Sequence, residues 1–383
     1  MPRARVKEST TLSHVRRREF LCWLVRAAGL AAGGGLLAAC SRPEPPTPTA
    51  IQIATPRSLP PTGTPTSTRG QRPTSTSTTM RGAAATTSPA PGETPTTAAP
   101  TETPTLPALA PTPAGTPDLV VARGGEPEAL VRQALAALGG MGRFVKPGDD
   151  VIVKPNICVA YHTYEYAATT NPWVVGTLVR LALEAGARRV RVMDSPFGGG
   201  PEEAYVRSGI QEQVLAAGGQ MELMASFKFA DTSIPQGVDI KRWSVYGDVL
   251  KADVVINVPV AKHHNLARLT LGMKNLMGVI QNRSALHRNL GQRLADLTSL
   301  VRPQLTVVDA VRILVDHGPT GGNLADVRKL DTVIASPDIV ATDAYAATLF
   351  GLKPDDLDYV RAGAAMGLGR SDLGSLKVEE ITA

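Results

Sequence analysis

Cysteine and aromatic residues are scarce in this sequence. Its 383 residues include three cysteines, at positions 22, 40 and 158, and aromatic residues make up 4% of the chain. No Cys-x-x-Cys pair is present, which excludes the common thiolate sites for zinc and leads us to expect no iron–sulfur cluster. The first two cysteines fall in an export signal described below. Cys158 would then be the single cysteine of the folded part, so no disulfide is expected within that part.

Common enzyme motifs are missing as well. The sequence has no Walker phosphate loop, no Gly-x-Gly-x-x-Gly, no Gly-x-Ser-x-Gly and no His-Glu-x-x-His. The familiar signatures of nucleotide-binding loops, serine hydrolases and zinc proteases are therefore absent. The function has to be inferred from less familiar residue patterns.

Most of the chain carries no excess of charge of either sign. The formal net charge is +6, but residues 1–40 hold 7 basic and 2 acidic residues, and residues 119–383 hold 28 of each. The basic character thus belongs mainly to the first forty residues. Charge gives no reason to expect a nucleic-acid partner.

The first forty residues have the pattern of an export signal. Arg17 and Arg18 precede an apolar run over residues 21–39 that is short and rich in glycine. The arginine pair resembles a twin-arginine signal, and the Leu-Ala-Ala-Cys ending at Cys40 resembles a lipobox. We therefore expect residues 1–39 to be a signal peptide that is read by the twin-arginine export machinery. Lipidated Cys40 would anchor the protein to the lipid bilayer on the extracytoplasmic face of the cell membrane. The alternative is an uncleaved anchor.

Residues 41–118 are dominated by two residue types. They contain 18 Pro and 21 Thr in 78 positions, with almost no apolar periodicity. Such a segment cannot bury enough apolar surface to offset the entropy of ordering it. We expect residues 40–118 to be a lipidated cysteine followed by a disordered linker. An O-glycosylated stalk is the alternative interpretation.

From residue 119 onward, short apolar runs alternate with segments of helical spacing. This alternation predicts an α/β domain over residues 119–383, with a mostly parallel sheet covered by helices on both faces. Residues 221–250 are a candidate β-rich insertion. We expect strands at residues 119–122, 150–153, 190–193, 253–258, 305–308 and 332–335, and helices at residues 127–138, 172–185, 202–208, 210–217 and 339–349.

Polar residues follow several of the expected strands. Lys154 and Asn156 come after one strand, Asp194 after the next, and Asp309 after a later one. In open α/β sheets, ligands bind beyond the carboxyl ends of the strands. We therefore expect these side chains to meet in one crevice, although a lone strand-end aspartate is more often a helix cap.

The densest group of ionisable residues lies between residues 262 and 275. Lys262, His263 and His264 are followed by Lys274 and Asn275. A neutral imidazole can ligate a metal or pass protons, and a buried lysine can act as a base or a nucleophile. The alternatives are a solvated basic loop or a simple anion site.

Several short segments occur in the order found in the family of the domain of unknown function 362, which the chain resembles over residues 119–370. Many members of that family carry a ferredoxin-like iron–sulfur module, for which this chain lacks the cysteines. The segments are Val151-Ile-Val-Lys-Pro-Asn156, Ala185-Gly-Ala187, residues 253–263, Gly272-Met-Lys-Asn-Leu-Met-Gly278 and Leu305–Asp309.

A fainter resemblance connects one segment to the nickel-pincer lactate racemases. His264 stands ten positions before Lys274, as a histidine and a lysine do in that family. The resemblance implies proton transfer by His264 and covalent attachment of a nickel-pincer nucleotide to Lys274, so a metal or such a nucleotide is the expected cofactor. His287 would be the counterpart of a nickel ligand. Asn171 stands near a position where relatives carry histidine, and an amide cannot relay protons.

Together these patterns predict an exported, membrane-anchored lipoprotein whose domain binds a small anionic or metal-containing ligand and catalyses a reaction that depends on lysine and histidine. A non-catalytic ligand-binding or cell-surface lipoprotein is the alternative. The predicted catalytic residues are His264, Lys274, His263 and Asp194; the ligand-binding residues are Lys154, Asn156, Lys262, Asn275 and Asp309; and the metal ligand is His287.

Overall fold

A computed structural model describes residues 115–383, which lie within one compact unit of the chain. The expected signal peptide and linker, with Arg17, Arg18 and Cys40, lie outside the described residues. Within residues 115–383, no helix is both long enough and apolar enough to cross a membrane.

The described residues form a ten-stranded sheet, and a separate two-stranded hairpin joins β5 (Phe229–Ser233) and β6 (Arg242–Tyr246). The order along the sheet is β12-β1-β11-β10-β7-β2-β3-β4. The strands from β10 to β4 run parallel to one another, whereas β11 is antiparallel to both of its neighbours. These strands are β1 (Leu119–Arg123), β2 (Asp150–Pro155), β3 (Arg189–Val192), β4 (Gln220–Met221), β7 (Val254–Val258), β10 (Leu305–Leu314), β11 (Val327–Ser336) and β12 (Val378–Thr382).

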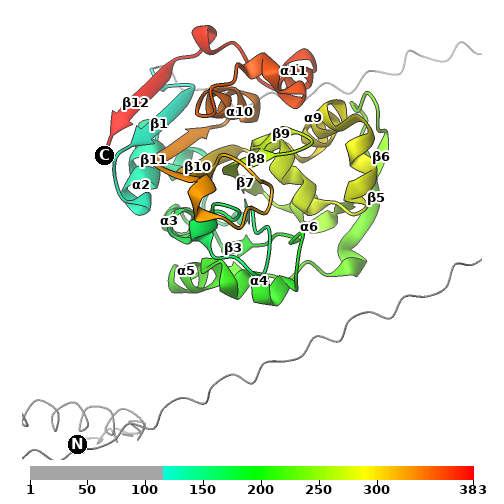
Figure 1. Ribbon diagram of the computed structural model, residues 1–383. Helices are drawn as coiled ribbons and strands as arrows, with labels where there is room; N and C mark the ends of the chain where they lie inside the picture. The colour runs from blue at the N-terminus through cyan, green and yellow to red at the C-terminus, as the bar shows by residue number, and fades with distance from the viewer. Residues whose placement is uncertain (1–114) are drawn as a thin grey trace, which may run out of the picture. The chain divides into compact units, whose positions relative to one another are not determined.

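Helices cover both faces of the sheet, as the sequence predicts (Figure 1). One face is covered by α2 (Pro127–Ala137), α3 (Pro172–Glu184), α4 (Pro201–Arg207) and α5 (Ile210–Ala216). The other is covered by α6 (Gly247–Lys251), α7 (Gly272–Asn275), α9 (Leu290–Val301), α10 (Ile339–Thr348) and α11 (Asp358–Ala365).

Alternation along the strands divides the core into two clusters, one on each face. In β1, Val120 and Ala122 pack with α2 and α3, whereas Leu119 and Val121 pack on the opposite side. Because successive strand side chains point to opposite faces, a strand buried on both sides must be apolar at every position. The central strands read as mostly apolar runs for this reason, and buried polar residues such as Lys154 and Asn257 are exceptions.

Several elements differ from those expected from the sequence. β10 and β11 are ten residues long because they continue beyond their pairing with β7 and β1 as a two-stranded ribbon. The ribbon carries Arg312 and Lys329, and it also contains the buried apolar residues Ile313 and Leu314. The β-rich segment expected within residues 221–250 corresponds to the β5–β6 hairpin. A second hairpin, β8 (Val260–His264) and β9 (Arg268–Thr270), has no counterpart among the expected strands, since its sequence is largely polar.

Candidate functional site

The β8–β9 hairpin begins one residue after β7 ends and stands at the carboxyl end of the parallel strands. Beneath it lies a pocket of about 570 Å³, which we call the Lys274 pocket. The chain segments that follow β2 and β3 contribute Asn156 and Asp194 to its lining, and the segment that follows the hairpin contributes Lys274. Of the four strand-end residues expected to meet in one crevice, Asn156 and Asp194 line this pocket, whereas Lys154 and Asp309 do not.

Successive side chains of a strand point to opposite sides, and this alternation places the middle residue of the Lys262-His263-His264 segment on the other side from its two neighbours. Lys262 and His264 line the Lys274 pocket, whereas His263 does not. The Nδ1 atom of His263 instead accepts a hydrogen bond from the backbone N–H of Gly318 at 3.1 Å. Adjacent side chains of a strand point in opposite directions, so the structure does not bring the predicted catalytic residue His263 to the pocket.

A fully buried group of polar side chains lies under the pocket. The ammonium of Lys154 donates to Asp194 Oδ1 at 2.7 Å, to the carbonyl of Pro155 at 2.9 Å and to Asn275 Oδ1 at 3.1 Å. The second carboxylate oxygen of Asp194 accepts the backbone N–H of Ile157 at 2.7 Å. We call Lys154, Asp194 and Asn275 the ion-pair layer.

The ion-pair layer has no spare donor on Lys154. A lysine ammonium has three N–H donors, and three protein oxygens accept them here. Lys154 does not line the pocket, and the predicted direct ligand contact by this residue is not what the geometry shows. Asp194 and Asn275 reach the pocket surface, but their positions are fixed by Lys154. The layer therefore positions the pocket from below.

Gly278 allows the chain after α7 to pass directly over this layer. A Cβ atom at residue 278 would overlap Asp194 Oδ1 and lie 2.5 Å from Lys154 Nζ. Only glycine leaves room for the ion pair at this distance. Close packing against the ion-pair layer thus explains why the Gly-Met-Lys-Asn-Leu-Met-Gly segment ends in glycine.

Short helix α7 carries Lys274 and is fastened at its N-terminus by a buried carboxylate. Asp343 of α10 accepts the backbone N–H of Gly272 at 2.6 Å and of Met273 at 2.9 Å. Burial raises the pKa of Asp343 to about 7, and the two N–H groups act in the opposite direction. Asp343 was not among the residues expected at the site, and it orients Lys274 without lining the pocket.

Lys274 lines the pocket as a buried amine without a carboxylate partner. Its residue is 8% exposed, and its Nζ has one neighbour within bonding distance, Met277 Sδ at 3.6 Å. Burial, reinforced by the charge of Lys262, lowers the pKa of Lys274 to about 7. A neutral amine is therefore well populated near neutral pH, which is the form that can act as a nucleophile or a base.

His264 is held in one tautomer. Its Nδ1 atom accepts the backbone N–H groups of Leu266 at 3.1 Å and of Ala267 at 3.3 Å. Burial, with the charges of Lys274 and Lys262, lowers the pKa of His264 to about 3. A neutral imidazole whose Nδ1 accepts carries its proton on Nε2. His264 thus offers the site a hydrogen-bond donor rather than a proton acceptor.

Two further polar atoms of the pocket have no partner in the part of the chain that the structure describes. Asn156 Oδ1 and Thr270 Oγ1 are buried side-chain oxygens without a hydrogen bond there, and both residues line the pocket. Buried polar groups are nearly always paired, and leaving one unpaired costs about 1–3 kcal/mol. We call Asn156, Thr270 and Lys274 the pocket wall.

Residues that the sequence reasoning did not place at the site complete the lining. Arg283 donates to the carbonyl of Ser195 at 2.8 Å, and Cys158 lies beside the buried amine of Lys262. Burial lowers the pKa of Lys262, whose Nζ donates to the carbonyl of Ala168 at 2.6 Å. The position of Cys158, two residues beyond Asn156, was the available signal for its presence here.

The histidines of the pocket do not form a metal site. The rings of His264 and His287 have centroids 6.5 Å apart, and both residues line the pocket. Within residues 115–383, no group of three His, Cys, Asp or Glu side chains could hold a metal ion. Because Nε2 of His264 carries the proton and its Nδ1 accepts two backbone N–H groups, this ring offers no free nitrogen to a metal ion. This donor set does not fit a metal ion held by the protein.

Asp309 does not line the Lys274 pocket. Its carboxylate accepts the backbone N–H of Asn171 at 2.7 Å and of Val311 at 3.0 Å. Burial raises the pKa of Asp309 to about 6 against the effect of those two bonds. The residue predicted to bind ligand therefore connects β10 to the start of α3.

Comparisons with known proteins identify the same family as the order of short segments in the sequence. Residues 151–348 match the model of a family described as Domain of unknown function (DUF362). The chain is similar to the Thylakoid-associated protein sll1697 of Synechocystis sp., with 28% identity over 249 residues, 63% of this chain and 75% of that relative.

Two solved structures are similar at a lower level. The lactate racemase apoprotein from Thermoanaerobacterium thermosaccharolyticum has a TM-score of 0.38 and 10% identity, over 56% of this chain and 53% of that one. A protein from Thermotoga maritima has a TM-score of 0.39 and 12% identity, over 59% and 60%. The chain thus spans less than two thirds of either solved protein. Similarities at this level carry no argument about function.

Proposed function

The chain belongs to the family of the domain of unknown function DUF362, and we propose that its α/β domain binds a small organic anion in the Lys274 pocket and carries out lysine-dependent chemistry on it. The observation that carries this proposal is the pocket wall. A buried amine faces a cavity together with two orphan oxygens, and no carboxylate of the described residues is paired with that amine.

The charges around the pocket favour a negatively charged ligand. Lys262, Lys274 and Arg283 line it without an ion pair in residues 115–383. Asp194, the lining carboxylate, is neutralised by Lys154 in the ion-pair layer. An entering anion would therefore be attracted by uncompensated positive charge, and it would accept hydrogen bonds from the Lys274 ammonium and the Thr270 hydroxyl.

The chemistry proposed for Lys274 follows from its lowered pKa. A neutral amine can add to a ligand carbonyl and form an imine, with water as the leaving group. The Nε2–H of His264 would donate a hydrogen bond to an oxygen of the ligand. A ligand with both a carboxylate and a carbonyl fits this arrangement, since the cationic side chains would hold one group while the amine meets the other.

Pyruvate is a suitable probe because it carries both groups. We expect saturable binding of pyruvate to the full-length protein by calorimetry, and borohydride reduction should leave a covalent adduct on Lys274 that is found by peptide mass spectrometry. Lys274→Met should abolish both, whereas Lys251→Met, at an exposed lysine at the end of α6, should change neither.

The outcomes of this experiment distinguish lysine-dependent chemistry from ligand binding without chemistry. Binding that depends on Lys274 without any adduct would support the non-catalytic ligand-binding alternative. If pyruvate and inorganic phosphate both fail to bind, or if they bind equally well to Lys274→Met, the proposed anion site is wrong.

A nickel-pincer-type nucleotide attached to Lys274 would be a special case of an anionic ligand. Lys274 is the residue that would hold it, but the histidines of the pocket do not supply a metal-ligand set. The mass of the Lys274 peptide from protein purified out of its native host tests this form, and metal analysis of the same sample accompanies it. An unmodified Lys274 in metal-free protein would contradict it.

The location of the protein is proposed from the N-terminal sequence. Arg17 and Arg18 would direct twin-arginine export, and lipidated Cys40 would anchor the domain on the extracytoplasmic face of the cell membrane. Labelling with a radioactive fatty acid should mark the native chain but not Cys40→Ser. Replacing both arginines by lysine should retain the protein in the cytoplasm. Labelling of Cys40→Ser equal to that of the native chain would contradict the anchor.

A further inference from the structure

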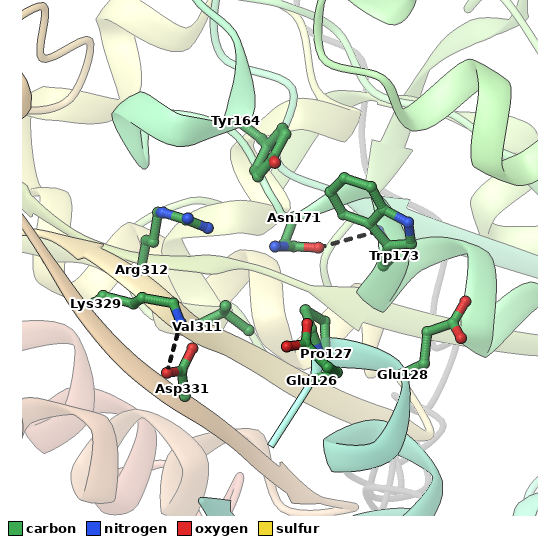
Figure 2. Close-up of a pocket in the computed structure, with 10 residues that line it drawn as sticks. All are labelled: Glu126, Pro127, Glu128, Tyr164, Asn171, Trp173, Val311, Arg312, Lys329 and Asp331. Carbon is green, nitrogen blue, oxygen red and sulfur yellow. Dashed lines mark hydrogen bonds and ion pairs between the residues drawn. The ribbon is translucent and has the colours of Figure 1, made fainter. Parts of the chain in front are cut away.

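A second pocket, of about 410 Å³, lies beside the β10–β11 ribbon and shares no lining residue with the Lys274 pocket. Figure 2 shows its side chains. Tyr164 and Trp173 form an aromatic wall, with ring centroids 5.2 Å apart and nearly perpendicular planes. Val311 and Pro127 contribute apolar lining. The pocket is thus partly aromatic and partly charged.

Arg312 provides a fixed, unpaired positive charge in this pocket. Its guanidinium lies 5.6 Å from the centre of the Tyr164 ring, a cation–π contact that holds the side chain in place. No ion pair or hydrogen bond engages Arg312 in residues 115–383. A planar guanidinium with free N–H groups is suited to bind a carboxylate through two parallel hydrogen bonds.

Asn171 supplies a second donor next to Arg312. The residue is 4% exposed, and its Oδ1 accepts the backbone N–H of Trp173 at 3.0 Å. This bond turns the amide nitrogen toward the pocket, on the side of Arg312 (Figure 2). That nitrogen has no hydrogen-bond partner among the described residues. Asp309, which accepts the backbone N–H of Asn171, fixes the position of the residue.

Negative charge lies across the pocket from Arg312. Glu126 precedes α2, and its carboxylate makes no capping hydrogen bond and no ion pair within residues 115–383. Glu128 also lines the pocket and makes no ion pair within residues 115–383, whereas Lys329 and Asp331 neutralise each other at 2.9 Å. Figure 2 shows Arg312 and Glu126 extending into the pocket from different sides. The unpaired charges of the pocket are therefore of both signs and are separated in space.

We propose that this second pocket binds a small zwitterion of the amino-acid or short-peptide class. Its carboxylate is held by Arg312 and the Asn171 amide, and its ammonium by Glu126. The body of the ligand packs against Tyr164 and Trp173. The proposal is independent of the anion site, because it uses none of the residues of the Lys274 pocket.

The test compares three dipeptides by calorimetry on the full-length protein. Alanyl-alanine has both charges, N-acetyl-alanyl-alanine lacks the ammonium, and alanyl-alanine amide lacks the carboxylate. We expect the free dipeptide to bind, and each capped form to bind about tenfold or more weakly. Fluorescence of Trp173 should change on binding in the Trp23→Phe/Trp243→Phe background.

Variants should remove the preference for one end at a time. In Arg312→Ala, the free and amidated dipeptides should bind equally weakly, whereas in Glu126→Gln the free and acetylated forms should do so. Arg312→Lys keeps the positive charge and should retain part of the preference, which guards against a folding defect in the alanine variant. Arg207→Ala and Glu202→Gln, on α4 outside the pocket, should leave all three affinities unchanged.

Three results would overturn the proposal. The first is equal binding of the free and capped dipeptides to the native protein. The second is a preference that survives in both Arg312→Ala and Glu126→Gln. The third is the absence of heat and of a Trp173 signal with alanyl-alanine up to its solubility limit.

Discussion

The ion-pair layer and the pocket wall are neighbours, and both contain buried lysines, but their hydrogen bonding differs. In the layer, three oxygens accept the three N–H donors of Lys154, and both oxygens of Asp194 are bonded. In the wall, Lys274 contacts a thioether, and Asn156 Oδ1 and Thr270 Oγ1 have no hydrogen-bond partner among residues 115–383. A buried lysine thus has all of its hydrogen-bond partners in the layer, whereas the buried lysine of the adjoining wall lacks them.

This difference distinguishes charged side chains that are already paired within the fold from a charged side chain that would gain its partner when a ligand binds. A buried ion pair that satisfies its own groups stabilises the pocket from below and leaves nothing for a ligand. A buried amine without a counter-charge lowers the stability of the folded protein, and binding of an anion would remove this penalty. The comparison gives the proposed anion site its physical basis.

The strongest test of the comparison is Lys154→Met. Removing this ammonium leaves the Asp194 carboxylate buried without its partner, and we expect a loss of about 3–5 kcal/mol in the free energy of unfolding. Urea denaturation followed by circular dichroism measures it. A loss no larger than that of the exposed control Lys251→Met would mean that the layer does not hold the site together.

Gly278→Ala tests the layer without removing a charge. The added methyl group would overlap Asp194 Oδ1 and approach Lys154 Nζ, so we expect a loss of about 1–3 kcal/mol from overpacking. Pyruvate binding should weaken as well, because the displaced carboxylate lies at the pocket surface. Gly142→Ala is the matched control, since a Cβ there has nothing within 4 Å. Equal stability of the two variants would refute the packing role of Gly278.

Lys274→Met should have the opposite effect on stability. Replacing an unpaired buried amine by an apolar side chain of similar length is expected to leave the ligand-free protein as stable as the native chain or more stable, within about 1 kcal/mol. The same substitution should abolish pyruvate binding. If Lys274→Met is instead as destabilising as Lys154→Met, the two lysines do not differ and the distinction between layer and wall fails.

The test with the smallest expected effect measures how the free energy of unfolding depends on pH through Lys274. Its pKa is lowered to about 7 in the folded protein, below the usual 10.5. The unfolded chain therefore binds the extra proton between these values, and the stability due to this group falls as the pH drops from about 10.5 toward 7. Lys274→Met should lack that slope in a series of urea denaturations.

The reactivity of the amine should follow the same titration. Acetylation of Lys274 by acetic anhydride, measured by peptide mass spectrometry, should have a midpoint near pH 7. Lys262→Met removes a neighbouring positive charge and should raise that midpoint. A midpoint near 10.5 in the native protein would show that Lys274 is not desolvated.

Several parts of the fold could be predicted from the sequence because strands that are buried on both faces appear in it as short apolar runs. The consecutive sheet strands β7, β2 and β3 are buried on both faces, so they appear as mostly apolar runs that end within two residues of the expected positions. The β8–β9 hairpin was not expected, because Lys262 and His264 line the Lys274 pocket and break the apolar pattern.

The amino-acid sequence by itself determined the α/β class, the family and the edge of the sheet where the polar residues gather, since apolar runs and strand-end positions are local properties of the chain. Only the tertiary structure decided which of those residues are already paired. Lys154 meets Asn275 across 121 positions of sequence, and Lys274 meets no carboxylate within residues 115–383. Hydrogen-bond partners are set by packing between distant segments, and no local pattern records them.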